Sequence, residues 1–383
     1  MQSPKVLRPL GVLSPGTFAL SESFSLSSPF VRHFTLHGDK LMDRRDFVKH
    51  AAVVAAAATA IGAIGCGKDK STAQSPGDSA PSVPSTKSPS ATPPASGAGK
   101  VGSNRHDPKA GAANVIVAKG TDAAVMLAAA MKAIGGADLF IHKGDVVVIK
   151  PNLAWGRTPE QAANTSPAVL AAVIKMAQAA GPKEVLVVEH SCDESSVSFE
   201  MSGAAKVCKD LGVRLVSLNN ESMYKEVALP QGITLKSEML PLDLLDCDCY
   251  INLPCSKVHS ASVVTFGLKN QMGVVWDRQR YHQSKSEAQK GGNLHQNIAD
   301  VATGMRPTLT IIDGLNSLVI GGPKGPGKVV ATNKLIVSAD MVAADAVAAP
   351  LVGSKPELVD HIRIAGEMGV GIADPSKLKI ANV

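Results

Sequence analysis

Short runs of consecutive apolar residues alternate with longer segments of helical periodicity through residues 113–383. The apolar runs stand at 115–118, 145–150, 184–189, 213–216, 249–253, 309–313 and 335–337. Continuous apolar runs, unlike alternating ones, are typical of strands that are buried on both faces of a sheet. Helical patterns lie between them at 122–134, at 167–180, near 198–211, and from the capping residue Asp340 through Leu351. The alternation predicts a single α/β domain with a doubly wound, mostly parallel sheet and helices on both faces.

The segment 1–112 lacks this alternation and has the features of an export signal. The motif Arg44-Arg45-x-Phe47-x-Lys49 precedes a weakly apolar, Ala-rich run at 51–65. A paired arginine before an apolar core and a small-residue cleavage site indicates export, and this motif resembles the twin-arginine signal. The run is too short to span a bilayer, which needs roughly 20 residues. Residues 42–65 are therefore expected to be a twin-arginine signal peptide.

The residues on either side of this segment complete the expected leader. Cys66 follows Ala63-Ile64-Gly65, which resembles a lipobox with Ala63 where the pattern prefers Leu, so a lipid is expected on Cys66. Translation is expected to start at Met42, which makes residues 1–41 a mis-annotated extension. Residues 66–112 carry almost no large apolar side chains and are expected to form a disordered tether. The protein is thus expected to be periplasmic or on the cell surface, with the lipid as its only membrane contact.

Charge and aromatic content narrow the class of partner. The chain has 39 Lys and Arg against 33 Asp and Glu, a formal net charge of +6. Residues 1–65 and 66–112 each contribute +3, which leaves 26 basic and 26 acidic residues in 113–383. Aromatic residues make up only 3% of the chain, whereas single-stranded nucleic acid is bound on aromatic side chains. A neutral domain poor in aromatic residues is not expected to bind nucleic acid.

Polar residues follow five of the predicted strands. In open α/β sheets, ligands bind beyond the carboxyl ends of the strands. The residues found there are Lys150-Pro151-Asn152, Glu189 through Glu194, Asn252 with Lys257 and His259, Asp313-Gly314, and Asp340. Any one of them is also compatible with an ordinary solvated loop, but together they predict a ligand site at this edge of the sheet.

Lysines and amides in this set suit an anionic ligand, a carboxylate or a phosphate. Substrate binding is expected from Lys150, Asn152, Lys269 and Asn270, and catalysis from His259, His282 and Lys257. Histidine can donate or accept a proton near neutral pH. The loop Gly321–Gly327 either brings backbone amides to the anion or is a surface turn between strands.

Several acidic and cysteine side chains are candidate ligands for a metal-ion cofactor. Asp313 is the first candidate for a hard cation, ahead of Asp345 and of Asp340, which is also expected to be a helix N-cap. Five cysteines remain besides Cys66, an odd number that excludes complete pairing within the chain. Cys247, Cys249 and Cys255 are compatible with a metal site, with a disulfide after export, or with burial as small apolar residues. Asp313 and Cys255 are taken as the metal candidates.

Several blocks together resemble a known family. They are Lys150-Pro151-Asn152, Thr165-Ser166-Pro167, Asn252 through His259, Gly267 through Gly273, His282, Asp313-Gly314, Gly322-Pro323, and Ser338 through Asp345. Over about residues 114–373 the sequence resembles the family called domain of unknown function 362, which has no firmly assigned reaction. Many members carry a ferredoxin-like segment with two iron–sulfur clusters. This chain has no Cys-x-x-Cys-x-x-Cys run, so no ferredoxin-type cluster is expected.

Two classes of function remain open from the sequence. The first is an exported, membrane-tethered enzyme that acts on a small anionic molecule by His- and Lys-based or metal-assisted chemistry. The second is a non-catalytic lipoprotein that binds a metal or another ligand. Loss of anion binding in Lys257→Ala, with no metal present, would favour the first class without a metal. A stoichiometric metal ion lost on mutating His259 or Cys255 would indicate a metal site.

Overall fold

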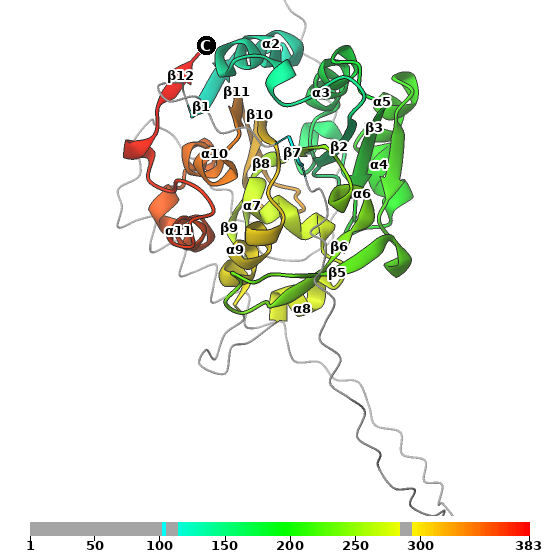
Figure 1. Cartoon of the computed structure of the whole chain (residues 1–383). Coiled ribbons are helices and arrows are strands. Elements are labelled where there is room, and N and C mark those ends of the chain that lie inside the picture. Colours follow the sequence, from blue (N-terminus) through cyan, green and yellow to red (C-terminus); the bar gives the residue numbers. More distant parts are fainter. Residues whose placement is uncertain (1–101, 105–113, 284–292) are drawn as a thin grey trace, which may run out of the picture. The chain divides into compact units, whose positions relative to one another are not determined.

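A computed structural model of the chain describes residues 102–104, 114–283 and 293–383, and every structural statement below refers to these residues (Figure 1). The expected extension (1–41), signal peptide (42–65), Cys66 and most of the expected tether lie outside them. The described part of the tether contacts the domain, since the Gly102 and Asn104 amides donate to the carbonyl oxygens of Cys247 and Asp248, at 3.2 and 3.0 Å.

A ten-stranded sheet forms the centre of the described domain. Its strands are β1 (Val115–Lys119), β2 (Val146–Pro151), β3 (Glu184–Glu189), β4 (Arg214–Ser217), β7 (Cys249–Leu253), β8 (Cys255–His259), β9 (Val263–Thr265), β10 (Leu309–Ile320), β11 (Lys328–Ser338) and β12 (Ile380–Asn382). The main path runs β12-β1-β11-β10-β7-β2-β3-β4, and β8 and β9 extend from β10. The pairs from β10 through β7, β2 and β3 to β4 are all parallel, whereas β11 is antiparallel to both of its neighbours.

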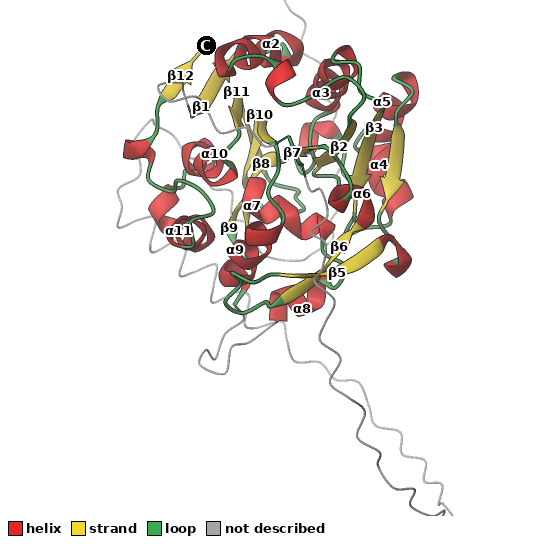
Figure 2. Ribbon diagram, viewed as in Figure 1, coloured by secondary structure: helices red, strands yellow, loops and turns green. Residues whose placement is uncertain are grey.

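Helices cover both faces of this sheet (Figure 2). One face carries α2 (Ala123–Ile134), α3 (Pro167–Ala179), α4 (Ser195–Met201) and α5 (Ala204–Asp210). The other carries α6 (Leu242–Leu245), α7 (Gly267–Asn270), α8 (Arg278–Gln283), α9 (Leu294–Gly304), α10 (Met341–Ala348) and α11 (Asp360–Glu367), with the hairpin β5 (Tyr224–Ala228) and β6 (Ser237–Pro241). The predicted fold class is confirmed.

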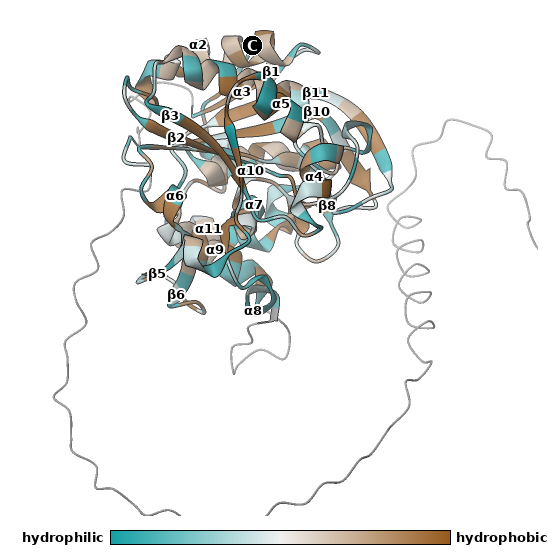
Figure 3. Ribbon diagram, turned by 90° about the vertical axis from the view of Figure 1, so that its right-hand side faces the viewer, coloured by the Kyte–Doolittle hydropathy of each residue, from teal (hydrophilic) through white to brown (hydrophobic). Residues whose placement is uncertain are grey.

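The core explains why the strands are continuously apolar. Along β2, Val147 and Ile149 pack with α2 and α3, while Val148 between them packs in the cluster on the opposite face. Successive strand side chains point to opposite faces, so a strand covered on both sides needs apolar residues at every position. Figure 3 shows β2 and β3 as hydrophobic along most of their length.

Two elements differ from the sequence prediction. The helix predicted near 198–211 is two helices, because Gly203 between them takes a left-handed conformation (φ 78°) and caps α5. The apolar runs 309–313 and 335–337 are only the inner parts of a long antiparallel hairpin formed by β10 and β11. The outer half of β11 is half-buried or exposed, and no strand is predicted for its short apolar stretch at 329–331.

The Gly-rich segment is the loop of this hairpin. The predicted helix N-cap at Asp340 also forms. Gly321–Gly327 connects β10 to β11, and its residue Pro323 also lines the cavity described below, so both interpretations of the loop stay open. Asp340 is the N-cap of α10, where its carboxylate accepts the Ala343 amide at 3.0 Å. Since β2, β3 and β7 are parallel, their carboxyl ends, at Pro151, Glu189 and Leu253, meet at the same edge of the sheet.

Candidate functional site

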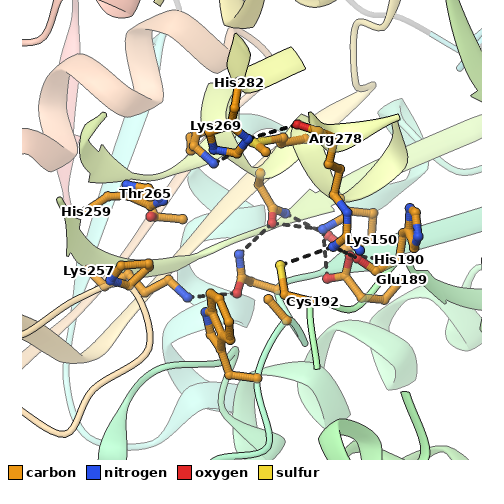
Figure 4. Close-up of a pocket in the computed structure, with 17 residues that line it drawn as sticks. Lys150, Glu189, His190, Cys192, Lys257, His259, Thr265, Lys269, Arg278 and His282 are labelled. Carbon is orange, nitrogen blue, oxygen red and sulfur yellow. Dashed lines mark hydrogen bonds and ion pairs between the residues drawn. The ribbon is translucent and has the colours of Figure 1, made fainter. Parts of the chain in front are cut away.

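A cavity of about 240 Å³ opens beside this edge, between the strand ends and the segment that carries α7 and α8 (Figure 4). Its lining includes all the residues that the sequence suggested for catalysis or substrate binding: Lys150, Asn152, Lys257, His259, Lys269, Asn270 and His282. These residues come from β2, β8, α7, α8 and the loop after β2, so the fold brings together positions that lie far apart in the sequence.

Lys150 forms a closed ion pair in the cavity wall. Its Nζ lies 2.8 Å from Glu189 Oε2, and both side chains are 1% exposed. The ammonium also donates to the carbonyl oxygen of Pro151 (2.7 Å) and to Asn270 Oδ1 (2.9 Å), so its three hydrogens are all engaged. Glu189 accepts two backbone amides as well, from Leu153 at 2.8 Å and from His190 at 2.9 Å. Burial lowers the pKa of Lys150, and the charge of Glu189 opposes that shift.

Asn270 connects this pair to the neighbouring strands. Its Oδ1 accepts from Lys150 and from Asn152 Nδ2. Its Nδ2 donates to Asn252 Oδ1 at 2.8 Å and to the carbonyl oxygens of Lys150 and Pro151 at 3.2 and 3.3 Å. Lys150 and Asn270 therefore line the cavity with their hydrogen-bonding groups engaged, an arrangement that suits a structural role better than direct contact with a substrate.

Gly273 shows how closely the chain approaches this pair. A Cβ atom at this position would overlap Glu189 Oε1 and the Lys150 ammonium, so no larger residue fits unless the ion pair moves. The spacing Asn270-x-x-Gly273 thus has a physical basis: the amide bonds the ion pair, and the glycine makes room for it.

Lys257 has neutral partners. Its Nζ, on a side chain that is 1% exposed, donates to Asn152 Oδ1 at 3.0 Å and to the carbonyl oxygen of Ala163. An ammonium carries three hydrogens, so one donor remains beyond these two bonds. Asn152 in turn donates to Asn270, which ties Lys257 to the network around Lys150.

Lys269 has the least polar surroundings of the three lysines. Its side chain is 7% exposed, and the sulfur of Met272, at 2.8 Å, is the one hydrogen-bond partner of Nζ among the described residues. Within the described residues, no carboxylate lies within ion-pair distance of it. Burial is the main cause that lowers the pKa of Lys269 to about 7; the nearby Cys192 opposes this, while the charges of Lys257, Lys150 and Arg278 add to it.

Asp345 fixes the helix that carries Lys269. Its two carboxylate oxygens accept the amides of Gly267 (2.7 Å) and Leu268 (2.9 Å) at the start of α7. Burial raises the pKa of Asp345 to about 8. This carboxyl group therefore holds the backbone in place and does not face the cavity as a cation ligand.

The two predicted catalytic histidines have opposite tautomers. His259 Nδ1 accepts the amides of Ala261 (3.0 Å) and Ser262 (3.3 Å), so its proton is assigned to Nε2. His282 Nδ1 lies 2.9 Å from the Arg278 carbonyl oxygen and must donate to it, which leaves a lone pair on Nε2. Burial, followed by the charges of Lys269 and Lys257, lowers the pKa of His259 to about 2. Burial also lowers the pKa of His282, against the effect of the hydrogen bond to Arg278.

Three further cavity residues have side chains with evident chemistry. His190 and Cys192 belong to the polar run after β3 that the sequence already marked, although no role was given to either. Arg278 was missed, since it lies on α8 and follows no strand. Its guanidinium donates to the carbonyl oxygens of His190 (3.0 Å) and Ser191 (2.8 Å) and contacts Cys192 Sγ at 3.1 Å.

The two metal candidates lie outside the cavity lining. The Asp313 carboxylate accepts the amides of Ser166 (2.7 Å) and Leu315 (3.1 Å), and Cys255 is buried with its thiol 3.7 Å from the Ala163 carbonyl oxygen. In the described residues no group of three or more His, Cys, Asp or Glu side chains is arranged to hold a metal ion. A metal at Asp313 and Cys255 stays a prediction that the geometry does not favour. Of the five described cysteines, all free, Cys192 alone is exposed.

Fold and site thus define an α/β protein with a cation-lined cavity at the carboxyl edge of a mostly parallel sheet. Residues 147–350, more than half of the chain, match the family described as domain of unknown function (DUF362), and the chain belongs to that family. It is also 24% identical over 261 residues to the thylakoid-associated protein sll1697 of Synechocystis sp. (strain ATCC 27184 / PCC 6803 / Kazusa). This alignment covers 66% of the chain and 79% of that protein.

Two solved structures show a weaker likeness. One is a protein from Thermotoga maritima, with a TM-score of 0.37, 11% identity, and coverage of 61% of this chain and 60% of that one. The other is the lactate racemase apoprotein from Thermoanaerobacterium thermosaccharolyticum, with a TM-score of 0.39, 13% identity, and coverage of 59% and 54%. The chain thus spans less than two thirds of either structure, and neither carries an argument about function.

Because the Lys150–Glu189 pair is buried, its single and double substitutions should not have additive effects on the free energy of unfolding. Lys150→Met should lower the free energy of unfolding by about 3–5 kcal/mol, because it leaves the Glu189 carboxylate buried without its counter-charge. Adding Glu189→Gln removes that charge, so the double variant should lose clearly less than the two single losses combined. Urea denaturation of the purified protein measures all three.

Lys206→Met is the matched control, since it breaks an exposed pair with Asp210 and should cost less than about 1 kcal/mol. The buried ion pair would be contradicted if the double variant lost as much free energy of unfolding as the two single variants together. Equal losses for Lys150→Met and Lys206→Met would also contradict it.

Proposed function

We propose that this protein is an enzyme that binds a small anionic substrate, a carboxylate or a phosphate, and transfers a proton to or from it. The observation that supports this most is the excess of cationic over anionic side chains among the residues that line the cavity. Among the described residues that line it, Glu189 is the one carboxylate, and Lys150 neutralises it. Lys257 and Arg278 therefore face the cavity without a counter-charge among its lining residues, and so does Lys269 when it is protonated. An anionic ligand would supply that charge, in surroundings where low polarity strengthens the attraction.

Proton transfer would come from the two histidines. His282 offers the lone pair of Nε2 as a base, and His259 offers the Nε2 hydrogen as a hydrogen-bond donor. The lowered pKa of each keeps both rings neutral at pH 7, so a base and a donor are present together. Lys257, with one hydrogen left, would hold the anionic group and stabilise negative charge that develops next to it.

The binding and chemical parts of the proposal can be tested separately. Titration calorimetry with acetate, lactate, malonate and inorganic phosphate should detect binding, and Lys257→Met should weaken it about tenfold or more. The rate of proton exchange at the carbon beside the carboxylate can be measured by NMR in deuterated water. It should fall about 100-fold in His282→Gln, with the affinity for the anion nearly unchanged. The control is Lys175→Met on the exposed face of α3, which should alter neither quantity.

Failure to bind any of these anions would contradict the proposal as a whole. Binding without exchange of any carboxylate would instead favour the non-catalytic, ligand-binding alternative. Loss of anion binding in Lys175→Met as large as in Lys257→Met would show that the cavity is not the binding site.

We also propose that the protein is exported by the twin-arginine route and anchored by a lipid on Cys66. Support comes from Arg44-Arg45-x-Phe47-x-Lys49 and from the small residues before Cys66, all outside the described residues. No helix of the described residues is both long and apolar enough to cross a membrane. The anchor would hold the domain beside a membrane through the tether.

Replacing both Arg44 and Arg45 with Lys should retain the unprocessed precursor in the cytoplasm of the native host. Cys66→Ala should prevent release of a lipidated mature chain, as judged by mass spectrometry of its first peptide. Lys70→Arg, outside the motif, is the control and should leave processing unchanged. Normal export of the double-lysine variant would contradict this proposal.

A further inference from the structure

The three lysines of the cavity differ in what their nitrogen atoms contact (Figure 4). Lys150 uses all three hydrogens on oxygen acceptors, one of them a carboxylate. Lys257 uses two on neutral oxygens. Within the part of the chain that the structure describes, Lys269 contacts only a thioether sulfur, which is a weak acceptor. Of the three, Lys269 has by far the weakest support for a positive charge.

The surroundings of Lys269 also penalise that charge. The side chain is buried, and Lys257, Lys150 and Arg278 all act on it as like charges. The other ionisable groups that interact with it electrostatically are Cys192, His259, His282 and His361. A buried amine beside other cations is held in its neutral, nucleophilic form, which is the form that attacks a carbonyl group.

We propose that Lys269 forms a covalent imine with a 2-oxo carboxylate, and that Lys257 holds the carboxylate of the same molecule. This inference rests on the proposed function and narrows its substrate class. The cavity calls for an anion, and the neutral amine calls for an electrophilic carbonyl carbon. A 2-oxo carboxylate carries both groups on adjacent carbons, which suits a cavity of about 240 Å³.

The step balances without an oxidant or reductant. The lone pair of Lys269 Nζ attacks the carbonyl carbon while the Nε2–H of His259 donates a hydrogen bond to the carbonyl oxygen. His282 Nε2 accepts a proton from the nitrogen and passes it to that oxygen, which becomes a hydroxyl group. The second proton of the nitrogen reaches the hydroxyl by the same route, so the hydroxyl leaves as water, a carbon–nitrogen double bond forms, and both amine hydrogens end in the released water. The imine then acidifies the neighbouring carbon, where His282 would act as the base.

Reductive trapping of the full-length protein with pyruvate and sodium cyanoborohydride tests this. Peptide mapping by mass spectrometry should find a mass increase on Lys269 equal to one pyruvic acid minus one oxygen atom. This should occur at pyruvate concentrations that barely label the exposed Lys175. The trapping yield at Lys269 should rise with pH through about 7, because only the free amine reacts. Lys269→Arg replaces the amine with a guanidinium, which forms no imine, and should abolish the cavity adduct. Lys257→Met should require about tenfold more pyruvate for the same labelling.

The outcomes separate this inference from the proposed function. Selective labelling of Lys269 supports the imine. Calorimetric binding of pyruvate with no more labelling at Lys269 than at Lys175 overturns the imine but leaves the anion site intact. Absence of binding by pyruvate, acetate, lactate, malonate and phosphate overturns both.

Discussion

The site depends on one buried ion pair, between Lys150 and Glu189. It places the only carboxylate of the described cavity lining against an ammonium, with Asn270 and two backbone amides completing the contacts. Such a pair is weak evidence for stability, since desolvation offsets its attraction. Its consequence here is electrostatic: the acid is neutralised inside the wall, and the remaining cations of the cavity have no protein counter-charge among the lining residues.

Residues of one type thus serve different purposes because their partners differ. Lys150 is a fixed part of the wall, Lys257 is a cation with a hydrogen to spare, and Lys269 is an amine in surroundings that disfavour its charge. The histidines divide in the same manner, since backbone amides hold His259 as a donor and a backbone carbonyl holds His282 as an acceptor. The hydrogen-bond partners of each residue, from side chains for the lysines and from the backbone for the histidines, set the chemistry available in this cavity.

The sequence predicts the part of this arrangement that rests on periodicity and topology. Apolar runs locate most of the strands, and the rule that parallel strands present their carboxyl ends at one edge brings Lys150, Lys257 and His259 together. Partners cannot be predicted in this way, because the engagement of Lys150 depends on Glu189, 39 positions later. Arg278 follows no strand, and the outer part of β11 is half-buried or exposed with only a short apolar stretch at 329–331, so neither is predicted.

The central claim is that the cavity contains positive charge which only an anion can balance. Anomalous diffraction from crystals soaked in sodium bromide tests this most directly, since bromide scatters strongly and needs no knowledge of the substrate. The account predicts a bromide ion in the cavity in contact with Lys257, lost in Lys257→Met. A cavity filled only by water in bromide-soaked crystals, with bromide bound elsewhere on the surface, would contradict it.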